Sequence, residues 1–223
     1  MKKLFIGTSL LLTSIIVPGQ AEESKNYLSI GGGITFPSDT KGDSSLGGTK
    51  YDFEYDIDSS ALFSIGIGRE FDDFRLEFNF SKATVEGDTI TVESGGAGVV
   101  ASITPALESD ITTYMIYGLK DFPTDSKFTP YAGIGLGLGH FSAKDQVATV
   151  AGTAFQFEGG DETVFSYGLK GGVSYDMGNN ASIFTEGLYQ GFSSYEISEP
   201  GFETVNYDGN HYFGISAGVK FSF

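Results

Sequence analysis

Hydrophobic and polar residues alternate with a period of two along most of the chain. In the segment 74–80 every even position is apolar and every odd position is polar. A helix would place Arg75 and Phe78 on neighbouring faces, whereas a strand sends alternate side chains to opposite faces. The alternation therefore predicts strands. Eight segments share it, namely 27–36, 57–69, 74–84, 110–120, 128–140, 164–175, 181–192 and 210–223.

The connections between these segments alternate between short and long. Barrels of the bacterial outer membrane have short periplasmic turns at one end and longer extracellular loops at the other. With eight strands, both ends of the chain fall on the side of the short turns. The pattern predicts an all-β fold, an eight-stranded antiparallel up-and-down transmembrane β-barrel. Short links lie near 71–73, 123–126 and 177–180, and long ones cover 37–56, 85–109, 141–163 and 193–209.

Residues 1–21 have the features of a secretory signal peptide. Two lysines precede a mostly apolar run, which is followed by the small residues Gly19 and Ala21 that a signal peptidase reads. The apolar run is too short to cross a membrane as a helix, which takes ~20 residues. We therefore expect cleavage after Ala21 and an outer-membrane barrel domain over residues 22–223.

The space inside such a barrel decides which face meets the lipid. One face of the strands is rich in Phe, Tyr, Ile and Leu, and the opposite face carries charged residues with many Gly and Ser. Eight strands leave an interior only wide enough for side chains, so the large rings cannot all lie inside. We expect the apolar face outside, with aromatic rings at both membrane interfaces. This outward set includes Ile111, Met115, Tyr117 and Leu119.

The polar face then places charges of both signs in the lumen. A buried charge without a partner costs several kcal/mol, so we expect a salt-bridge network that closes the barrel. Lys170 and Glu186 lie eight residues either side of Gly178, and a hairpin centred there sets them opposite each other. A narrow conducting pore lined by the same residues is the alternative. The predicted lumenal charges are Arg75, Glu77, Lys120, Lys170, Glu186 and Lys220.

A run of alternate glycines, from Gly133 to Gly139, invites comparison with a phosphate-binding loop. A dinucleotide-binding loop opens a helix, whereas these glycines keep a period of two within a strand. Inward glycines instead leave room in a narrow barrel for large neighbours. The neighbours that we expect to benefit are Tyr131, Phe184, Leu188 and Tyr212.

The composition excludes several classes of function. The 223 residues include 13 basic and 29 acidic ones, and a formal net charge of -16 disfavours binding to nucleic acid. There is no cysteine and there are only two histidines, which removes thiolate chemistry and leaves little material for imidazole sites. We expect no cofactor.

Three stretches of the sequence carry a family resemblance. They are Asp121-Phe122-Pro123, the segment from Phe128 to Gly137, and the last five residues, Val219 to Phe223. In these stretches the chain resembles the small outer-membrane β-barrel proteins of Gram-negative bacteria, the porin-family or opacity-type barrels related to surface antigens. The resemblance implies location in the outer membrane, among its lipid and lipopolysaccharide. It also implies that Phe221 and Phe223 are the assembly signal read by the barrel assembly machinery.

His140-Phe141-Ser142 is the strongest enzymatic feature. It resembles the His-x-Ser element of outer-membrane lipid A deacylases, whose Ser–His–acid site lies on the outer surface of an eight-stranded barrel. A serine nucleophile needs a base within reach and an acid that orients the base. The acid position that the resemblance implies is occupied by Ala154, and the nearest acids are Asp145 and Glu158. A histidine in the interfacial belt is the alternative.

Asp52, Glu54, Asp56 and Asp58 share one parity near the extracellular start of the second strand and are candidate calcium ligands. A solvated face is the simpler interpretation. The long loops as a group are acidic, and such a surface would act through divalent cations shared with lipopolysaccharide or would meet a basic extracellular partner. We therefore expect an integral outer-membrane protein, not an enzyme, with a structural or surface-exposed role of the antigen or adhesion kind and a largely plugged lumen. A narrow porin and a lipid A-modifying enzyme are the alternatives.

Overall fold

The computed structural model describes most of the chain. The predicted signal peptide lies outside the described residues. Among the residues described, no helix has the length and apolar character to cross a membrane. The description covers residues 24–46, 48–94, 98–103, 107–144, 146–150, 153–157, 160–197 and 205–223.

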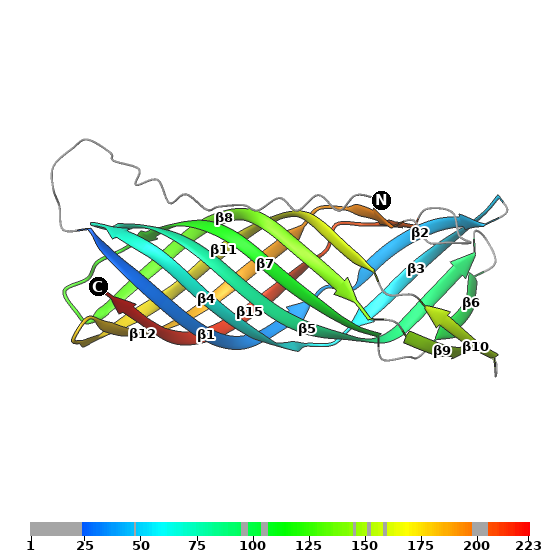
Figure 1. Cartoon of the computed structure of the whole chain (residues 1–223), viewed down its shortest axis with the longest axis horizontal. Coiled ribbons are helices and arrows are strands. Elements are labelled where there is room, and N and C mark those ends of the chain that lie inside the picture. The colour runs from blue at the N-terminus through cyan, green and yellow to red at the C-terminus, as the bar shows by residue number, and fades with distance from the viewer. Residues whose placement is uncertain are drawn as a thin grey trace, which may run out of the picture.

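Eight strands close into an antiparallel barrel (Figure 1). Their order around the barrel is β5-β4-β1-β15-β12-β11-β8-β7, and pairing between β7 and β5 completes the ring. The predicted fold class is confirmed, and each predicted segment overlaps one of these strands. The strands are β1 (Lys25–Pro37), β4 (Ser60–Phe71), β5 (Phe74–Ser94), β7 (Leu107–Asp121), β8 (Phe128–Ala143), β11 (Asp161–Gly178), β12 (Ala181–Phe192) and β15 (His211–Ser222).

Tight turns join the strands at the end where the chain finishes, which we call the turn end (Figure 1). Asn179 and Asn180 link β11 to β12 with φ angles of 56° and 62°. Positive φ at both central residues matches the right-handed twist of a hairpin, and asparagine tolerates it. In the turn between β4 and β5, the first central residue, Asp72, has a positive φ of 47° and the second does not. The short connections therefore have local chemical causes.

The opposite end, which we call the loop end, is not made of plain connections. β5 runs to Ser94, well beyond its predicted end at residue 84, and pairs there with β3 on one side and β6 on the other. The strand order β13-β14-β2-β3-β5-β6 continues the barrel wall as an open sheet, and β9 pairs with β10 separately. The further strands are β2 (Thr40–Leu46), β3 (Thr49–Ile57), β6 (Gly98–Ile103), β9 (Gln146–Val150), β10 (Thr153–Phe157), β13 (Tyr195–Ile197) and β14 (Val205–Tyr207).

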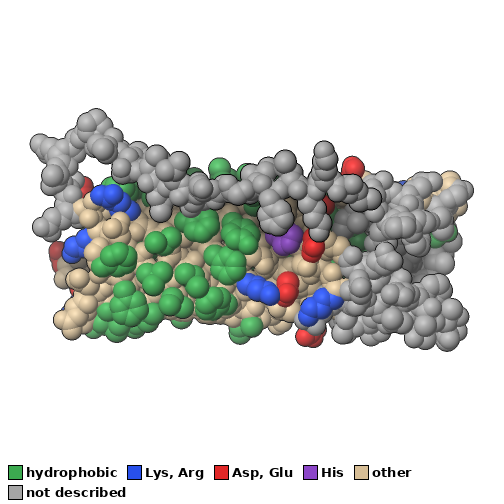
Figure 2. Space-filling model, in the orientation of Figure 1, with side chains coloured by type: hydrophobic (Ala, Val, Ile, Leu, Met, Phe, Trp, Pro, Cys, Tyr) green, Lys and Arg blue, Asp and Glu red, His purple; other side chains and the backbone are tan. Residues whose placement is uncertain are grey.

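The barrel is apolar outside and polar inside. Figure 2 shows hydrophobic side chains covering the wall, and Ile134 and Ile215 are 68% and 62% exposed. Inside, small polar side chains such as Ser64, Thr113 and Ser166 are almost completely buried. A water-soluble barrel would have the reverse arrangement, so this surface is built for lipid.

One strand, β7, has the opposite orientation to the one predicted. Met115, Tyr117 and Leu119 are each 1% exposed and point into the lumen, and Ile111 joins them. Lys120 therefore lies on the outer surface, not in the lumen, and pairs with Asp73. Both faces of this strand are largely apolar, so the period of two gave no information about which face is inside.

Hydrogen bonding from Lys120 holds the pKa of the Asp73 carboxyl below its usual value. Asp73 lies in the turn between β4 and β5, and Lys120 is the last but one residue of β7. The pair therefore joins two strands at the rim of the turn end. A lysine at this edge can keep its charge in water while its stem covers apolar surface.

Glycines of β8 make room for the inward side chains of β7. A Cβ at Gly135 would lie 2.5 Å from a ring carbon of Tyr117, and one at Gly137 would lie 2.8 Å from the sulfur of Met115. Steric relief by inward glycines is thus confirmed, but these neighbours differ from the predicted ones. Three of the predicted neighbours lie against glycines of other strands, namely Tyr131 against Gly172, Phe184 against Gly218 and Leu188 against Gly214.

The lipid-facing assignment predicts a cost for charge that depends on depth. Ile134→Arg, in the middle of β8, should destabilise the barrel by about 2–4 kcal/mol, because the guanidinium would lie near the bilayer midplane. Phe122→Arg at the turn end is the matched control and should cost at most about 1 kcal/mol. Urea unfolding in lipid vesicles measures both. Equal costs would show that Ile134 does not face the bilayer interior.

Candidate functional site: an ion network in the lumen

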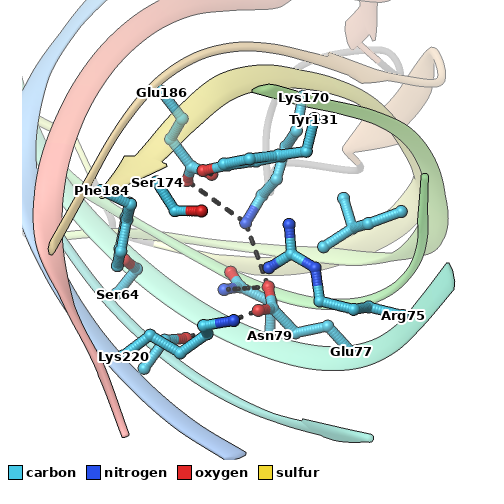
Figure 3. Close-up of a pocket in the computed structure, with 12 residues that line it drawn as sticks. Ser64, Arg75, Glu77, Asn79, Tyr131, Lys170, Ser174, Phe184, Glu186 and Lys220 are labelled. Carbon is cyan, nitrogen blue, oxygen red and sulfur yellow. Dashed lines mark hydrogen bonds and ion pairs between the residues drawn. The ribbon is translucent and has the colours of Figure 1, made fainter. Parts of the chain in front are cut away.

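Lys170 occupies the centre of the lumen between two carboxylates (Figure 3). Its Nζ lies 3.2 Å from Oε1 of Glu77 and 3.4 Å from Oε1 of Glu186. The three residues come from β11, β5 and β12, and each side chain is at most 7% exposed. The ammonium also lies 4.5 Å from the centroid of the Tyr117 ring. One buried cation therefore links strands on different sides of the barrel.

Neutral donors complete the coordination of both carboxylates. Tyr131 donates a hydrogen bond to Oε2 of Glu186 at 2.9 Å, and Ser216 donates to Oε1 at 3.3 Å. Three residues donate to Glu77, and their hydroxyl and amide groups leave neither oxygen unsatisfied. Such donors stabilise a charge that has left water. These donors to Glu77 are Tyr27 at 3.1 Å, Ser29 at 3.4 Å and Asn79 at 3.2 Å.

Two further ion pairs lie nearer the turn end. Arg75 donates to Oδ1 of Asp121 at 2.7 Å, and its guanidinium lies 4.6 Å from the Tyr131 ring centroid. Nε of Arg75 is buried without a hydrogen-bond partner among the described residues. Lys220 pairs with Glu70. The lumen thus holds Arg75, Glu77, Lys170, Glu186 and Lys220 together.

Glu70 and Asp121 are lumenal partners that were not among the predicted site residues. Glu70 follows Leu62 and Ser64 on the inward parity of β4, so the alternation could have revealed it. Asp121 was hidden by the wrong orientation of β7, since it continues the inward series that ends in Leu119. In the observed orientation of β7, Asp121 and not Lys120 contributes the lumenal charge of this strand.

The register between β11 and β12 differs from the predicted one. Lys170 pairs with Leu188 and Glu186 with Gly172, because the turn is centred on Asn179 and the pairing shifts at Asp176. Moving the centre by one residue moves the pairing by two. The long side chains of Lys170 and Glu186 still meet along the diagonal, as such side chains can in an antiparallel pair.

The rest of the lumen is filled. Next to Lys170, Tyr117 donates to Oε1 of Gln190 at 2.9 Å. Cavities of about 20 Å³ and 10 Å³ lie beside the ion network, which is room for a water molecule or so. Towards the loop end the interior becomes an apolar cluster. Its members are Val85, Ile111, Val164, Phe192 and Tyr212.

The predicted enzymatic residues do not form a triad among the described residues. Nδ1 of His140 lies 2.9 Å from Oγ1 of Thr163, and Nε2 lies 4.0 Å from Oδ1 of Asp161. Ser142 is the register partner of Asp161 on the neighbouring strand, but no hydrogen bond joins it to His140 in the described part. Asp145 and Glu158 lie outside the described residues.

The acidic row on β3 does not converge on a metal site. Within the described segments, no group of three or more possible ligands could hold a metal ion. Asp52 pairs with Lys50 at 3.1 Å and Glu54 with Lys41 at 2.9 Å, both on the exposed face of the β2–β3 hairpin. Asp56 and Asp58 are also exposed. The calcium prediction therefore has no support in the geometry.

A family model described as outer membrane protein beta-barrel domain matches residues 7–221. The chain belongs to this family. The barrel accordingly lies in the outer membrane of a Gram-negative bacterium. Short turns of such barrels are periplasmic and long loops are extracellular, so the turn end is periplasmic and the loop end extracellular. Phe221 and Phe223 then lie on the outer surface at the periplasmic end, 47% and 68% exposed.

Individual relatives agree with this assignment. Outer membrane protein PagN of Salmonella typhimurium is 27% identical over 157 residues, which cover 67% of this chain. The match spans 61% of PagN, less than two thirds of that relative's length.

Two solved structures share the fold. Neisserial surface protein A superposes with a TM-score of 0.54 at 19% identity, covering 91% of this chain and 100% of that one. The Escherichia coli outer membrane protease OmpT superposes with a TM-score of 0.57 at 12% identity, covering 89% and 97%. Because a fold hosts unrelated functions, these likenesses leave activity open.

The geometry of the ion network predicts strongly non-additive stability effects. Lys170→Met should cost about 3–5 kcal/mol, because it leaves two buried carboxylates without their cation. Glu186→Gln should cost less, since Lys170 keeps Glu77. The triple variant Glu77→Gln, Lys170→Met, Glu186→Gln should be more stable than Lys170→Met alone.

Urea unfolding in vesicles of these variants provides the measurement. Lys220→Met is a matched control, because Lys220 is paired closer to the periplasmic rim and its side chain is 13% exposed. It should cost less than Lys170→Met. Small additive effects at all positions would mean that water fills the lumen and screens the charges.

Proposed function

We propose that the chain is a closed barrel that holds an acidic β-sheet above the outer membrane for contact with partners outside the cell. One observation carries the proposal: the barrel wall continues past the membrane as the sheet β13-β14-β2-β3-β5-β6. A channel needs an open lumen and no folded extension, whereas a binding surface is commonly carried by segments that a scaffold positions.

The filled lumen supports a non-conducting barrel. Lys170, Glu77 and Glu186 bridge the periplasmic half, and the apolar cluster around Phe192 fills the extracellular half. An ion would have to break buried ion pairs and then cross an apolar layer without compensating ligands, and each step is costly.

The outer face of the extracellular sheet carries opposed like charges. Asp43, Asp52 and Glu93 are consecutive register partners across β2, β3 and β5. Lys50 offsets two of them, at 3.9 Å from Asp43 and 3.1 Å from Asp52. Like charges directly opposite each other destabilise a sheet, so their presence fits a role in binding. The chemistry suits a cationic partner, or divalent cations shared with lipopolysaccharide phosphates.

Planar bilayers test the closed lumen. Purified protein should show no steady conductance, because no continuous water path crosses the ion network. The positive control combines Tyr117→Ala, which removes a ring beside the ion network, with Phe192→Ala, which removes one from the apolar cluster. This variant should conduct more often, which would show that the assay detects an open lumen. Steady steps from the unaltered chain would reject the closed barrel and support a narrow porin.

Binding of fluorescent polylysine to expressing cells tests the acidic sheet. Asp43→Asn, Asp52→Asn and Glu93→Gln together should lower binding several-fold. These changes remove three negative charges from the outer face and keep the shape of the side chains. The control combines Asp72→Asn and Asp125→Asn, which lie at the periplasmic end. Equal loss with both variants would show that the sheet is not the binding surface.

We also propose that the chain has no lipid A-modifying activity. Support comes from the contacts of His140, whose Nδ1 is occupied by Thr163 and whose nearest described acid lies at 4.0 Å, beyond hydrogen-bond reach. Mass spectrometry of lipid A from expressing cells should give the same spectrum with the unaltered chain and with Ser142→Ala. Loss of an acyl chain only with the unaltered sequence would establish the enzyme.

Assembly is proposed to depend on the C-terminal aromatic strand. Phe223 continues β15 through backbone hydrogen bonds to Asn26, at 2.7 and 3.0 Å, which close β1 against β15. Deleting Phe223 should reduce insertion into the outer membrane several-fold and leave export intact. The readout is heat-modifiable migration on gels, with Phe122→Ala as control. Normal migration of the deletion variant would contradict the proposal.

A further inference from the structure

The lipid-facing wall carries an open groove that the ion network and the sheet do not explain. It has a volume of about 460 Å³ and lies over β11, β12 and β15, beside the end of β1. Its floor contains Gly171 and Gly187, which are register partners on adjacent strands. Its walls are apolar and aromatic, formed by Phe36, Leu169, Tyr189, Phe213 and Ile215.

Internal packing does not require the two glycines of the floor. A Cβ at Gly171 or at Gly187 would come no closer than 3.9 Å to another atom, which is ordinary contact. Gly135 in the lumen differs, since a Cβ there would lie 2.5 Å from the Tyr117 ring. Glycine inside a strand weakens the strand and often marks close approach by a ligand. The groove therefore indicates a ligand that binds from outside the protein.

The groove runs from the middle of the barrel wall to its extracellular edge. Phe36 is the last but one residue of β1, and Phe213 is the third of β15, both at the extracellular ends of their strands. Above the groove, the His211 ring packs 5.4 Å from Tyr189 and 5.7 Å from Phe213 between centroids. An apolar hollow with an amphipathic rim of His and Tyr matches the layering of a lipid at the membrane interface.

We propose that this groove holds an acyl chain of lipopolysaccharide in the outer leaflet. The groove is continuous with the lipid-facing wall, and its volume falls in the ~300–1,000 Å³ range of ligand pockets. A flexible apolar chain can follow a glycine floor between bulky walls. A second barrel is convex and would touch the walls without reaching the floor. The proposal does not depend on the closed lumen or on the acidic sheet.

Native mass spectrometry of the purified barrel, titrated with lipopolysaccharide or with phosphatidylethanolamine, provides the test. The unaltered chain should retain lipopolysaccharide in preference to phosphatidylethanolamine. Gly187→Leu fills the floor and should weaken retention about tenfold, which corresponds to lost contact with about two methylene groups. Ala61→Leu introduces the same side chain on the exposed wall at β4, outside the groove, and should change nothing. Heat-modifiable migration verifies folding of both.

A second measurement keeps the proposal testable if Gly187→Leu fails to fold. A photo-crosslinking side chain at Leu169 in the groove wall should capture lipopolysaccharide in cells, more than one at Ile65 on the exposed wall of β4. Equal capture at both positions, equal retention of the two lipids, or crosslinking of Leu169 to a second copy of the chain would each overturn the proposal.

Discussion

The contact of Lys170 with Glu77 and Glu186 is the interaction on which the interior of this barrel depends. Eight strands enclose a space only wide enough for side chains, so whatever lies inside must pack and be paired. The ammonium between two carboxylates joins β5, β11 and β12, and tyrosine and serine hydroxyls satisfy the remaining oxygen sites. Removing a single partner would leave charge in a space with room for hardly any water. The network and the narrow lumen therefore require each other.

Glycine placement makes this interior possible. Large rings such as Tyr117 and Tyr131 lie directly over glycines of the neighbouring strands, where any side chain would collide with them. The same rings then supply hydroxyl donors and π-faces to the buried charges. The same tyrosines therefore both fill the interior and stabilise the buried charges. Towards the extracellular end, an apolar cluster packs the lumen with uncharged side chains.

The outer surface and the extracellular sheet meet different solvents and differ accordingly. The wall meets lipid and is apolar, and it carries a glycine-floored groove over β11, β12 and β15. The sheet meets water and carries acids on its outer face, while its inner face is aromatic. Tyr195 stacks 5.0 Å from Tyr207 and 5.5 Å from Phe141 between centroids, which ties the sheet to the barrel mouth. Burial among these rings raises the pKa of Tyr195.

The sequence by itself determined the fold class, the number of barrel strands, the family, and the orientation of those strands that have one polar face. Period-two alternation reports directly which residues share a face, and a narrow barrel in lipid leaves only one assignment of faces. It also placed Lys170 with Glu186, although through the wrong register. Only the tertiary structure decided which face of β7 points into the lumen. Both faces of this strand are largely apolar, and it is the packing of one face against the glycines of β8 that identifies the inner face. The orientation of β7 also places Lys120 on the outer surface and Asp121 beside Arg75 in the lumen. The extracellular sheet could not be predicted from the sequence either. Its strands come from segments that are distant in the chain, and their pairing depends on where the barrel strands end.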